Sequence, residues 1–296
     1  MPRPDSGPPA GTPAAVPAAT AGLPPLRLNG RALGRFAIMG VVNRTPDSFF
    51  DRGATFGFRA ALDAVARAVD QGADIVDIGG VKAGPGDEVD VAEELRRVVD
   101  VVAAVRDRHP DVVISVDTWR AEVGEAVAAA GADLLNDTWG GPDPRLAEVA
   151  AAHGIGLVCA HAGGLEPRTR PHRTGYADVV ADVARHVTAE ARRAADLGVR
   201  RDAILIDPAH DFGKNTRHSL EITRRLGELT ATGWPVLVAV SNKDFIGETL
   251  GRPVDQRGVG TMAVLGVSAR LGARVFRVHD VAGARRALDA VAALGP

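Results

Sequence analysis

One pattern of apolar and polar positions repeats along the chain. A short apolar run ends in a polar side chain, a loop follows, and an amphipathic segment comes next. Each run is apolar on both faces, as parallel strands covered by helices must be. The eight runs span 37–42, 74–78, 112–117, 133–136, 155–161, 203–207, 235–240 and 274–279. Segments with helical spacing lie between them, for example 58–71, 88–106, 120–130, 177–197, 216–230 and 281–293.

Eight strand and helix units in unbroken order predict an α/β fold, a single-domain (β/α)8 TIM barrel whose chemistry lies at the carboxyl ends of the strands. A doubly wound open sheet is the competing architecture, but no glycine fingerprint follows the first strand. The polar side chains at the run ends are therefore expected to meet at one rim. They are Asn43, Asp77, Asp117, Asn136, His161, Asp207, Lys243 and His279.

Two segments precede the first long run. Residues 1–25 contain eight prolines among alanine, glycine and threonine, which predicts a disordered tail. Residues 26–33, LRLNGRAL, place Asn29 and Gly30 between short apolar alternations, which is typical of a tight hairpin turn. We expect this N-terminal hairpin to cap the closed end of the barrel, so that the barrel domain spans 26–296.

Composition narrows the function classes. The net charge of −2 leaves no broad basic surface for nucleic acid, and no apolar stretch approaches the roughly 20 residues that span a bilayer. Cys159 lies inside an apolar run, where a small buried residue is the expected role. A single cysteine forms no internal disulfide, which predicts a reducing, cytoplasmic location.

Three of the strand-end residues, Asp117, Asn136 and Asp207, are hydrogen-bond acceptors that would be desolvated inside a barrel mouth and so need donor partners. Asp117 could instead cap the following helix. Arg277 and His279 lie two apart on one strand and point to the same side, as expected of anion-binding residues. Arg277 could alternatively pair with an internal aspartate.

Seven ordered motifs make the interpretation specific. They are IMGVVNRTPDSF at 38–49, ADIVDIGG, ISVDT, GADLLNDTWGG, ILIDPAHDFGKN, SNK and RVHDV, and together they run from about Ile38 to Leu288. In type, order and spacing the set resembles the dihydropteroate synthase family. The resemblance implies a reaction in which para-aminobenzoate displaces pyrophosphate from the methylene carbon of a dihydropterin pyrophosphate, with Mg²⁺ assisting the leaving group.

The resemblance also implies roles for particular residues and a homodimer formed through outer helices. The pterin edge presents N–H donors that suit carboxylates and a carbonyl that suits an ammonium. Phe212 and Lys243 would sandwich the pterin rings. The pterin pocket maps to Asp117, Asn136, Asp207, Phe212 and Lys243, the pyrophosphate site to Asn43, Arg277 and His279, the metal contact to Asn43, and the catalytic set to Asn43, Lys243, Arg277 and His279.

The chain departs from the family pattern mainly around the acceptor. The loop DIGGVKAGPG has Ala83 and Gly84 where the family carries threonine and a mobile arginine, and Lys82 is displaced from that arginine's position. At SNKD, Asn242 replaces the family's arginine, and Asp244 replaces a serine at a helix start that receives the carboxylate of para-aminobenzoate in the family. An aspartate there is expected to repel that carboxylate and weaken its binding. PAHDFGK puts His210 and Asp211 in a turn that is usually small and apolar, and Ala162 stands where a methionine is common.

Three functions follow from this comparison. The first is a dihydropteroate synthase-like protein with weak activity, because the residues expected to bind the pterin are all present and those expected to bind para-aminobenzoate are altered. The second is an inactive or repurposed homologue that binds a pterin-like ligand or uses another acceptor. The third is a pterin-binding methyltransferase subunit, which needs no pyrophosphate site, so that Arg277, His279 and Lys243 argue against it.

Overall fold

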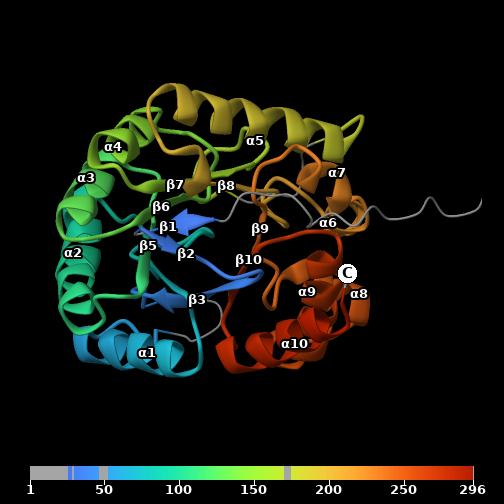
Figure 1. The fold of residues 1–296 in the computed structure, drawn as a ribbon, viewed down its shortest axis with the longest axis horizontal. Helices are drawn as coiled ribbons and strands as arrows, with labels where there is room; N and C mark the ends of the chain where they lie inside the picture. The colour runs from blue at the N-terminus through green and yellow to red at the C-terminus, as the bar shows by residue number, and fades with distance from the viewer. Residues whose placement is uncertain (1–25, 29, 47–52, 170–174, 296) are drawn as a thin grey trace, which may run out of the picture.

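Eight parallel strands form a barrel surrounded by helices (Figure 1). The computed structural model describes residues 26–28, 30–46, 53–169 and 175–295. The predicted tail at 1–25 and Asn29 of the predicted turn lie outside these residues. The barrel strands are β3 (Ala37–Asn43), β4 (Ile75–Gly79), β5 (Val113–Asp117), β6 (Leu134–Asp137), β7 (Gly156–Ala160), β8 (Ile204–Asp207), β9 (Leu237–Val238) and β10 (Val275–Val278).

The pairing order confirms the predicted barrel. Neighbouring strands run β8-β7-β6-β5-β4-β3-β10-β9, and a parallel bridge between Ile206 and Val236 joins β8 to the start of β9, which closes the ring. Each predicted strand overlaps an observed one. The register pairs Gly79 with Asp117 and Asp117 with Asn136. Polar residues far apart in sequence are thereby brought to one level at the carboxyl edge.

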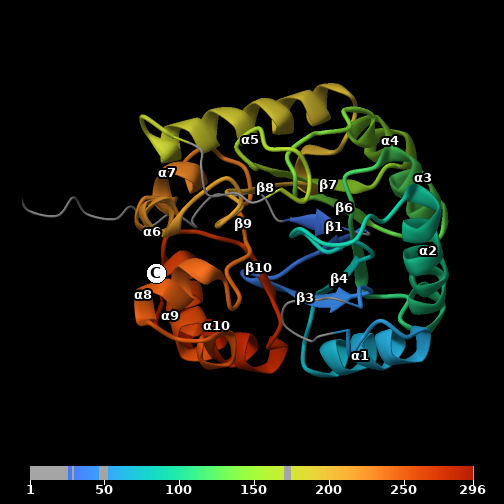
Figure 2. The ribbon, with the colours of Figure 1, turned by 180° about the vertical axis from the view of Figure 1, so that it is seen from behind.

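Helices cover the outside of the barrel in chain order (Figures 1 and 2). The predicted segment 216–230 divides into two helices at Arg225, and three helices were not delimited from sequence: α4, α8 and α9. The helices are α1 (Phe58–Asp70), α2 (Val91–Arg108), α3 (Ala121–Ala129), α4 (Arg145–His153), α5 (Val179–Asp196), α6 (Thr216–Arg224), α7 (Leu226–Thr230), α8 (Asp244–Leu250), α9 (Gly258–Arg270) and α10 (Val281–Ala293). Within the described ranges, none of them is both long and apolar enough to cross a membrane.

Aspartate side chains cap the amino ends of several helices. Asp90 accepts a hydrogen bond from the Glu93 amide at the start of α2, and Asp280 accepts one from the Gly283 amide at the start of α10. Asp178 does the same for two amides of α5. Such caps satisfy amides that have no partner inside the helix, and they fix where each helix leaves the rim loops.

The N-terminal hairpin closes the far end of the barrel. Strands β1 (Arg27–Leu28) and β2 (Arg31–Ala32) pair in antiparallel fashion. Leu26, Leu28 and Leu33 are buried in one cluster with residues near the start of the barrel strands, among them Ala37 and Ile75. The predicted cap is therefore confirmed. Because the amino ends of the strands are plugged by apolar side chains, ligand access is left to the carboxyl ends.

Candidate functional site

A cavity of about 640 Å³ opens at the carboxyl ends of the strands. Its walls come from the strand ends and from the loops after β3, β4, β6, β7, β8 and β9. Asn136, although predicted for the site, is fully buried and does not line the cavity. The other predicted residues all line it: Asn43, Asp117, Asp207, Phe212, Lys243, Arg277 and His279.

Arg277 pairs with two aspartates at the floor of the cavity. Its Nε lies 2.6 Å from Asp77 Oδ2, and its Nη2 lies 3.0 Å from Asp117 Oδ2. The sequence left open whether Arg277 meets an anion or an internal aspartate, and the structure shows the internal pairing. The third guanidinium nitrogen, Nη1, takes part in neither pair. Arg277 also lines the cavity, so a role toward pyrophosphate stays a prediction.

Asp77 organises this floor, and sequence analysis gave it no role beyond a strand end. Its Oδ1 accepts a hydrogen bond from Ser115 Oγ at 2.6 Å, and its Oδ2 accepts one from Asn136 Nδ2 at 3.2 Å. Asn136 Oδ1 is buried and has no hydrogen-bond partner among the described residues. Asp77 thus fixes the Asn136 amide so that its oxygen remains an acceptor for a donor group.

Two carboxylates face the cavity in different electrostatic environments. Burial raises the pKa of Asp117 to about 7, although the Arg277 charge lowers it. Asp117 also accepts a hydrogen bond from Thr138 Oγ1, and α3 begins after Arg120, so the helix-cap alternative is not supported. Burial likewise raises the pKa of Asp207, against the lowering effect of the Lys243 charge. Both groups gain from a ligand that donates hydrogen bonds.

Lys243 and Phe212 lie against each other in the wall of the cavity. Lys243 Nζ lies 4.8 Å from the centre of the Phe212 ring and donates a hydrogen bond to the His210 carbonyl. Trp139 packs edge-on against Phe212, with ring centres 5.1 Å apart. A flat ring between Phe212 and Lys243 would require the ammonium to move off the ring, so the predicted sandwich remains a prediction. Trp139 was given no role from sequence, although it lies inside the motif GADLLNDTWGG, two residues after Asp137.

His279 has a defined hydrogen-bond geometry at the end of β10. Its amide lies 3.2 Å from Ser241 Oγ, and its Nδ1 lies 2.9 Å from the same oxygen. The two contacts to one hydroxyl fix the orientation of the His279 ring at the cavity wall.

Lys214 joins the loops after β7 and β8 through hydrogen bonds to their carbonyls. Its buried ammonium donates to the carbonyls of His161 at 2.6 Å, Phe212 at 2.7 Å and Ala209 at 3.2 Å. Burial lowers the pKa of Lys214 to about 7, with the Lys243 charge adding to the effect. The three carbonyls belong to the loops after β7 and β8, so one side chain fixes both.

We expect Lys214→Met to lower the free energy of unfolding by roughly 1–3 kcal/mol, because buried carbonyls lose their donor while the apolar volume is retained. The measurement is urea unfolding followed by circular dichroism. Arg217→Met, at an exposed position of α6, is the control and should change stability by less than about 0.5 kcal/mol. Equal stability of the two variants would contradict this role of Lys214.

Left-handed backbone is concentrated at the rim. Among the described residues, the non-glycine residues with positive φ are Arg168 (66°), Ala209 (48°), Asp211 (69°) and Asn242 (55°). All four lie in loops that follow β7, β8 or β9. Such conformations cost of order 1–3 kcal/mol each and are typical of ligand-binding loops. Asp211 is held by Ser219 Oγ and by the Phe245 amide, and His210 stacks on Phe245 with ring centres 5.5 Å apart.

The structure adds a partner for the unusual Asp244. The Asp244 side chain is 79% exposed, and its Oδ1 lies 2.8 Å from Arg257 Nη1. The same nitrogen donates to the Asn242 carbonyl at 2.9 Å. Arg257 therefore offsets part of the negative charge that was expected to repel a carboxylate. Sequence analysis did not include Arg257, which lies just before α9.

His161 faces away from the cavity. Its Nε2 lies 3.0 Å from Asp182 Oδ2 of α5, and its ring meets His186 at 5.3 Å between centres. Burial lowers the pKa of His161 to about 3. Although it ends a strand, its side chain joins the barrel to the helix layer.

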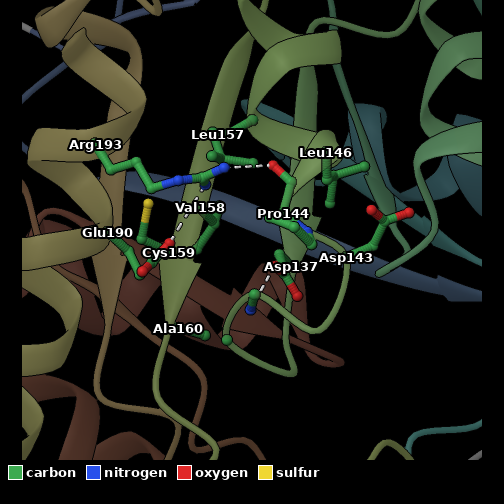
Figure 3. A pocket seen from close by; sticks show the side chains of 13 residues that line it. Asp137, Asp143, Pro144, Leu146, Leu157, Val158, Cys159, Ala160, Glu190 and Arg193 are labelled. Carbon is green, nitrogen blue, oxygen red and sulfur yellow. Dashed lines mark hydrogen bonds and ion pairs between the residues drawn. The ribbon is translucent and has the colours of Figure 1, made fainter. Parts of the chain in front are cut away.

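A second cavity lies outside the barrel, between β6, β7 and the helices α4 and α5 (Figure 3). Its volume of about 20 Å³ holds no more than a water molecule. Cys159 lines it as a buried free thiol, which confirms the expected burial. Arg193 donates to the Pro144 carbonyl at 2.7 Å, and Asp137 accepts from the Gly141 amide at 2.8 Å. This cavity is too small for an organic substrate.

Comparison with known proteins identifies the family of the chain. Residues 39–279 match the family model described as "Pterin binding enzyme". A Mycobacterium tuberculosis (strain H37Rv) protein named "Inactive dihydropteroate synthase 2" is 58% identical over 264 residues, covering 88% of this chain and 83% of that protein. Yersinia pestis dihydropteroate synthase in a sulfonamide drug complex superposes with a TM-score of 0.85 at 36% identity, covering 91% and 98% of the two chains. Xanthomonas albilineans dihydropteroate synthase in complex with 7,8-dihydropteroate gives 0.79 at 37% identity, covering 92% and 98%.

The fold, the rim cavity and the family match define a pterin-binding (β/α)8 barrel, and the chain belongs to the pterin-binding enzyme family. Within that family it is a dihydropteroate synthase-like protein. Its relatives include proteins named as synthases and proteins named as inactive.

Proposed function

We propose that this protein binds a dihydropterin pyrophosphate at the barrel mouth and that its condensation of this ligand with para-aminobenzoate is weak. The observation that carries the proposal is an asymmetry of the cavity. The acceptors and cations expected around a pterin and a diphosphate all lie in or beneath one cavity. The residues expected around the acceptor acid are replaced at 84, 242 and 244.

The pterin would bind on the side of the cavity that carries the carboxylates. Its amino group and ring N–H suit Asp207 and the buried Asn136 oxygen, which are acceptors with unused capacity. Its carbonyl suits the Lys243 ammonium. Desolvated acceptors of this kind favour a ligand that supplies donors, because leaving them unpaired costs about 1–3 kcal/mol each.

The pyrophosphate would meet Asn43, Arg277 and His279 at the ends of β3 and β10. These side chains line the same cavity, and Ser241 Oγ holds the His279 ring through Nδ1. Charge develops on the departing pyrophosphate, so fixed donors and cations stabilise the transition state more than the ground state. No strong general base is needed, because the attacking aromatic amine is unprotonated at neutral pH.

We propose Mg²⁺ as the cofactor and Asn43 as its contact on the protein. No group of three or more histidine, cysteine, aspartate or glutamate side chains suited to a metal occurs in the described parts of the chain. The oxygen of Asn43 fits an ion that is carried mainly by substrate phosphates and water, as Mg²⁺ commonly is. When bound, the ion would neutralise charge on the leaving group.

The acceptor acid would find few partners. Gly84 supplies no side-chain donor, Asn242 carries no charge, and Asp244 adds an acid that Arg257 only partly offsets. Each lost charge-assisted hydrogen bond lowers affinity by roughly 10-fold to 150-fold. The expected result is a normal pterin affinity combined with a low rate for para-aminobenzoate.

The test combines two measurements on the purified full chain with Mg²⁺. Calorimetry should show binding of dihydropterin pyrophosphate, and a coupled pyrophosphate assay should show slow release when para-aminobenzoate is added. Absence of binding would overturn the whole proposal. Binding without any release would leave the repurposed homologue, the alternative that the name of the mycobacterial relative favours. Rescue of a bacterial strain that lacks dihydropteroate synthase would exclude that alternative.

We also propose a cytoplasmic homodimer. The resemblance implies a dimer through outer helices, and α9 provides a suitable surface. Val259 is 86% exposed and Val267 is 51% exposed, and with the exposed Ala263 they lie on one face at intervals of four residues. A helix that is apolar on its outer face as well as toward the barrel is typical of an interface.

We expect the wild-type chain to run as a dimer in light scattering, at about twice the mass of the 30.8 kDa chain. Val267→Glu should shift the mass to one chain, because an unpaired carboxylate would be buried in the interface. Leu197→Glu, at another exposed apolar position, is the control. A monomeric wild type, or a dimer unaffected by Val267→Glu, would contradict an interface at α9.

A further inference from the structure

Arg168 connects two walls of the cavity. It lies in the loop after β7, and its guanidinium reaches the loop after β4, where Nη1 donates to the Asp87 carbonyl at 2.6 Å and Nε to the Gly84 carbonyl at 3.4 Å. In the barrel, β5 and β6 separate β4 from β7. The side chain therefore spans part of the rim rather than joining adjacent loops.

Both connected segments bound the cavity. Residues 81–85 form one wall, and Thr169, next to Arg168, lies on another. The loop at 83–86 reads Ala-Gly-Pro-Gly and has almost no side chains with which to hold itself in place. Glycine-rich backbone loses much entropy on ordering, so an external donor to its carbonyls has a large effect on its position.

The backbone conformation of Arg168 also indicates that its side chain holds the loop in place. Its φ of 66° is a left-handed conformation that is unfavourable for a residue with a long side chain. The two hydrogen bonds to carbonyls offset this cost. Arginine suits the task because its planar fork offers several donors in fixed directions. The guanidinium comes to lie beside the backbone of Gly84, a position that itself carries no side chain.

We propose that Arg168 is a positioning residue, a clasp that holds the loop 81–87 closed against the cavity and slows ligand exchange. It acts through the loop and does not line the cavity itself. The ligand part of this inference rests on the proposed binding of dihydropterin pyrophosphate. The loop part does not, and it can be tested on the free protein.

The chain offers a selective probe of the loop. It has three lysines: Lys82 lies in the loop, Lys214 is buried, and Lys243 lies at the start of α8. A protease that cuts only after lysine should therefore cleave native protein first at Lys82–Ala83. Cleavage needs local opening of the loop, so its rate reports how firmly the loop is held.

We expect Arg168→Ala to accelerate cleavage at Lys82–Ala83 by about tenfold and to raise the dissociation rate of dihydropterin pyrophosphate by a similar factor. The unfolding midpoint should not move. Arg168→Lys should restore part of the resistance, and mass spectrometry separates its new cleavage site from Lys82. Arg192→Ala, at an exposed position of α5, is the control and should match wild type.

The outcomes separate the two proposals. Unchanged cleavage in Arg168→Ala, or an equal change in Arg192→Ala, would overturn the clasp whether or not the ligand binds. Faster cleavage in a protein that binds no dihydropterin pyrophosphate would keep the clasp and reject the proposed ligand. Faster cleavage with an unchanged dissociation rate would reject the effect on ligand exchange.

Discussion

Asp207→Ala should abolish measurable binding of dihydropterin pyrophosphate, with a loss of affinity of about 100-fold or more. The side chain is buried at the end of β8, and one of its oxygens is held by the Ala209 amide at 2.7 Å. The carboxylate can accept from two donors of a pterin edge, and each charge-assisted hydrogen bond is worth roughly 1.5–3 kcal/mol. Alanine removes both acceptors and leaves the ligand donors unpaired.

Calorimetry with dihydropterin pyrophosphate measures this loss, and two variants make it interpretable. Asp207→Asn retains an oxygen that can accept from the Ala209 amide, so it should fold like wild type and bind with intermediate affinity. Asp289→Ala, at an exposed position of α10, should bind normally. Unchanged affinity in Asp207→Ala would mean that the pterin does not bind where these carboxylates converge.

The strand ends were predictable because they depend on local pattern. A buried parallel strand must be apolar on both faces, so the first polar residue marks where the chain emerges from the barrel. Asp117 and Asp207 were placed correctly at the rim for that reason. The hydrophobic pattern was least precise for α9. Apolar residues such as Val259 and Val267 lie on its outer face as well as its inner face, so the pattern does not mark which face is buried.

The contacts between rim residues were not predictable in the same way. Arg277 pairs with Asp77 across 200 positions of sequence, and nothing in either motif selects that aspartate over Asp207. Arg257 reaches Asp244 and Arg168 reaches Asp87 from loops without distinctive composition. Long side chains on irregular loops choose their partners by three-dimensional proximity, which the order of strands does not determine.

These contacts change the interpretation of the residues that are replaced around the expected para-aminobenzoate site. From sequence, Asp244 was expected to repel an incoming carboxylate, whereas in the structure Asp244 forms an ion pair with Arg257. The Arg257 guanidinium, which could pair with the carboxylate of an acid substrate, is therefore already paired with Asp244. The Asp244 side chain is 79% exposed and that of Arg257 is 14% exposed, so removing Asp244 should leave the Arg257 charge without its carboxylate while the hydrogen bond to the Asn242 carbonyl remains.

Gly84→Arg combined with Asp244→Ser should therefore raise kcat/KM for para-aminobenzoate by about 100-fold or more. Position 84 can accept the side chain, because a Cβ there would meet only Lys82 Cε at 3.7 Å. The new arginine supplies a guanidinium to the loop, the serine supplies a hydroxyl donor, and the charge of Arg257 is no longer neutralised by Asp244. Two recovered charge-assisted contacts at roughly 10-fold to 150-fold each set the size of the gain.

Pyrophosphate release at fixed dihydropterin pyrophosphate and varied para-aminobenzoate measures this gain. Gly84→Ala with Asp244→Ala is the matched control, since it removes the acid and changes the loop without adding donors. A gain in the control equal to that of the first pair would assign the effect to removal of Asp244, through lost repulsion and the uncompensated Arg257 charge, and not to the added donors. No gain in either pair, with pterin binding intact, would contradict an acceptor-side cause of the low rate and point to the pyrophosphate end, where Arg277 is held by two aspartates through Nε and Nη2.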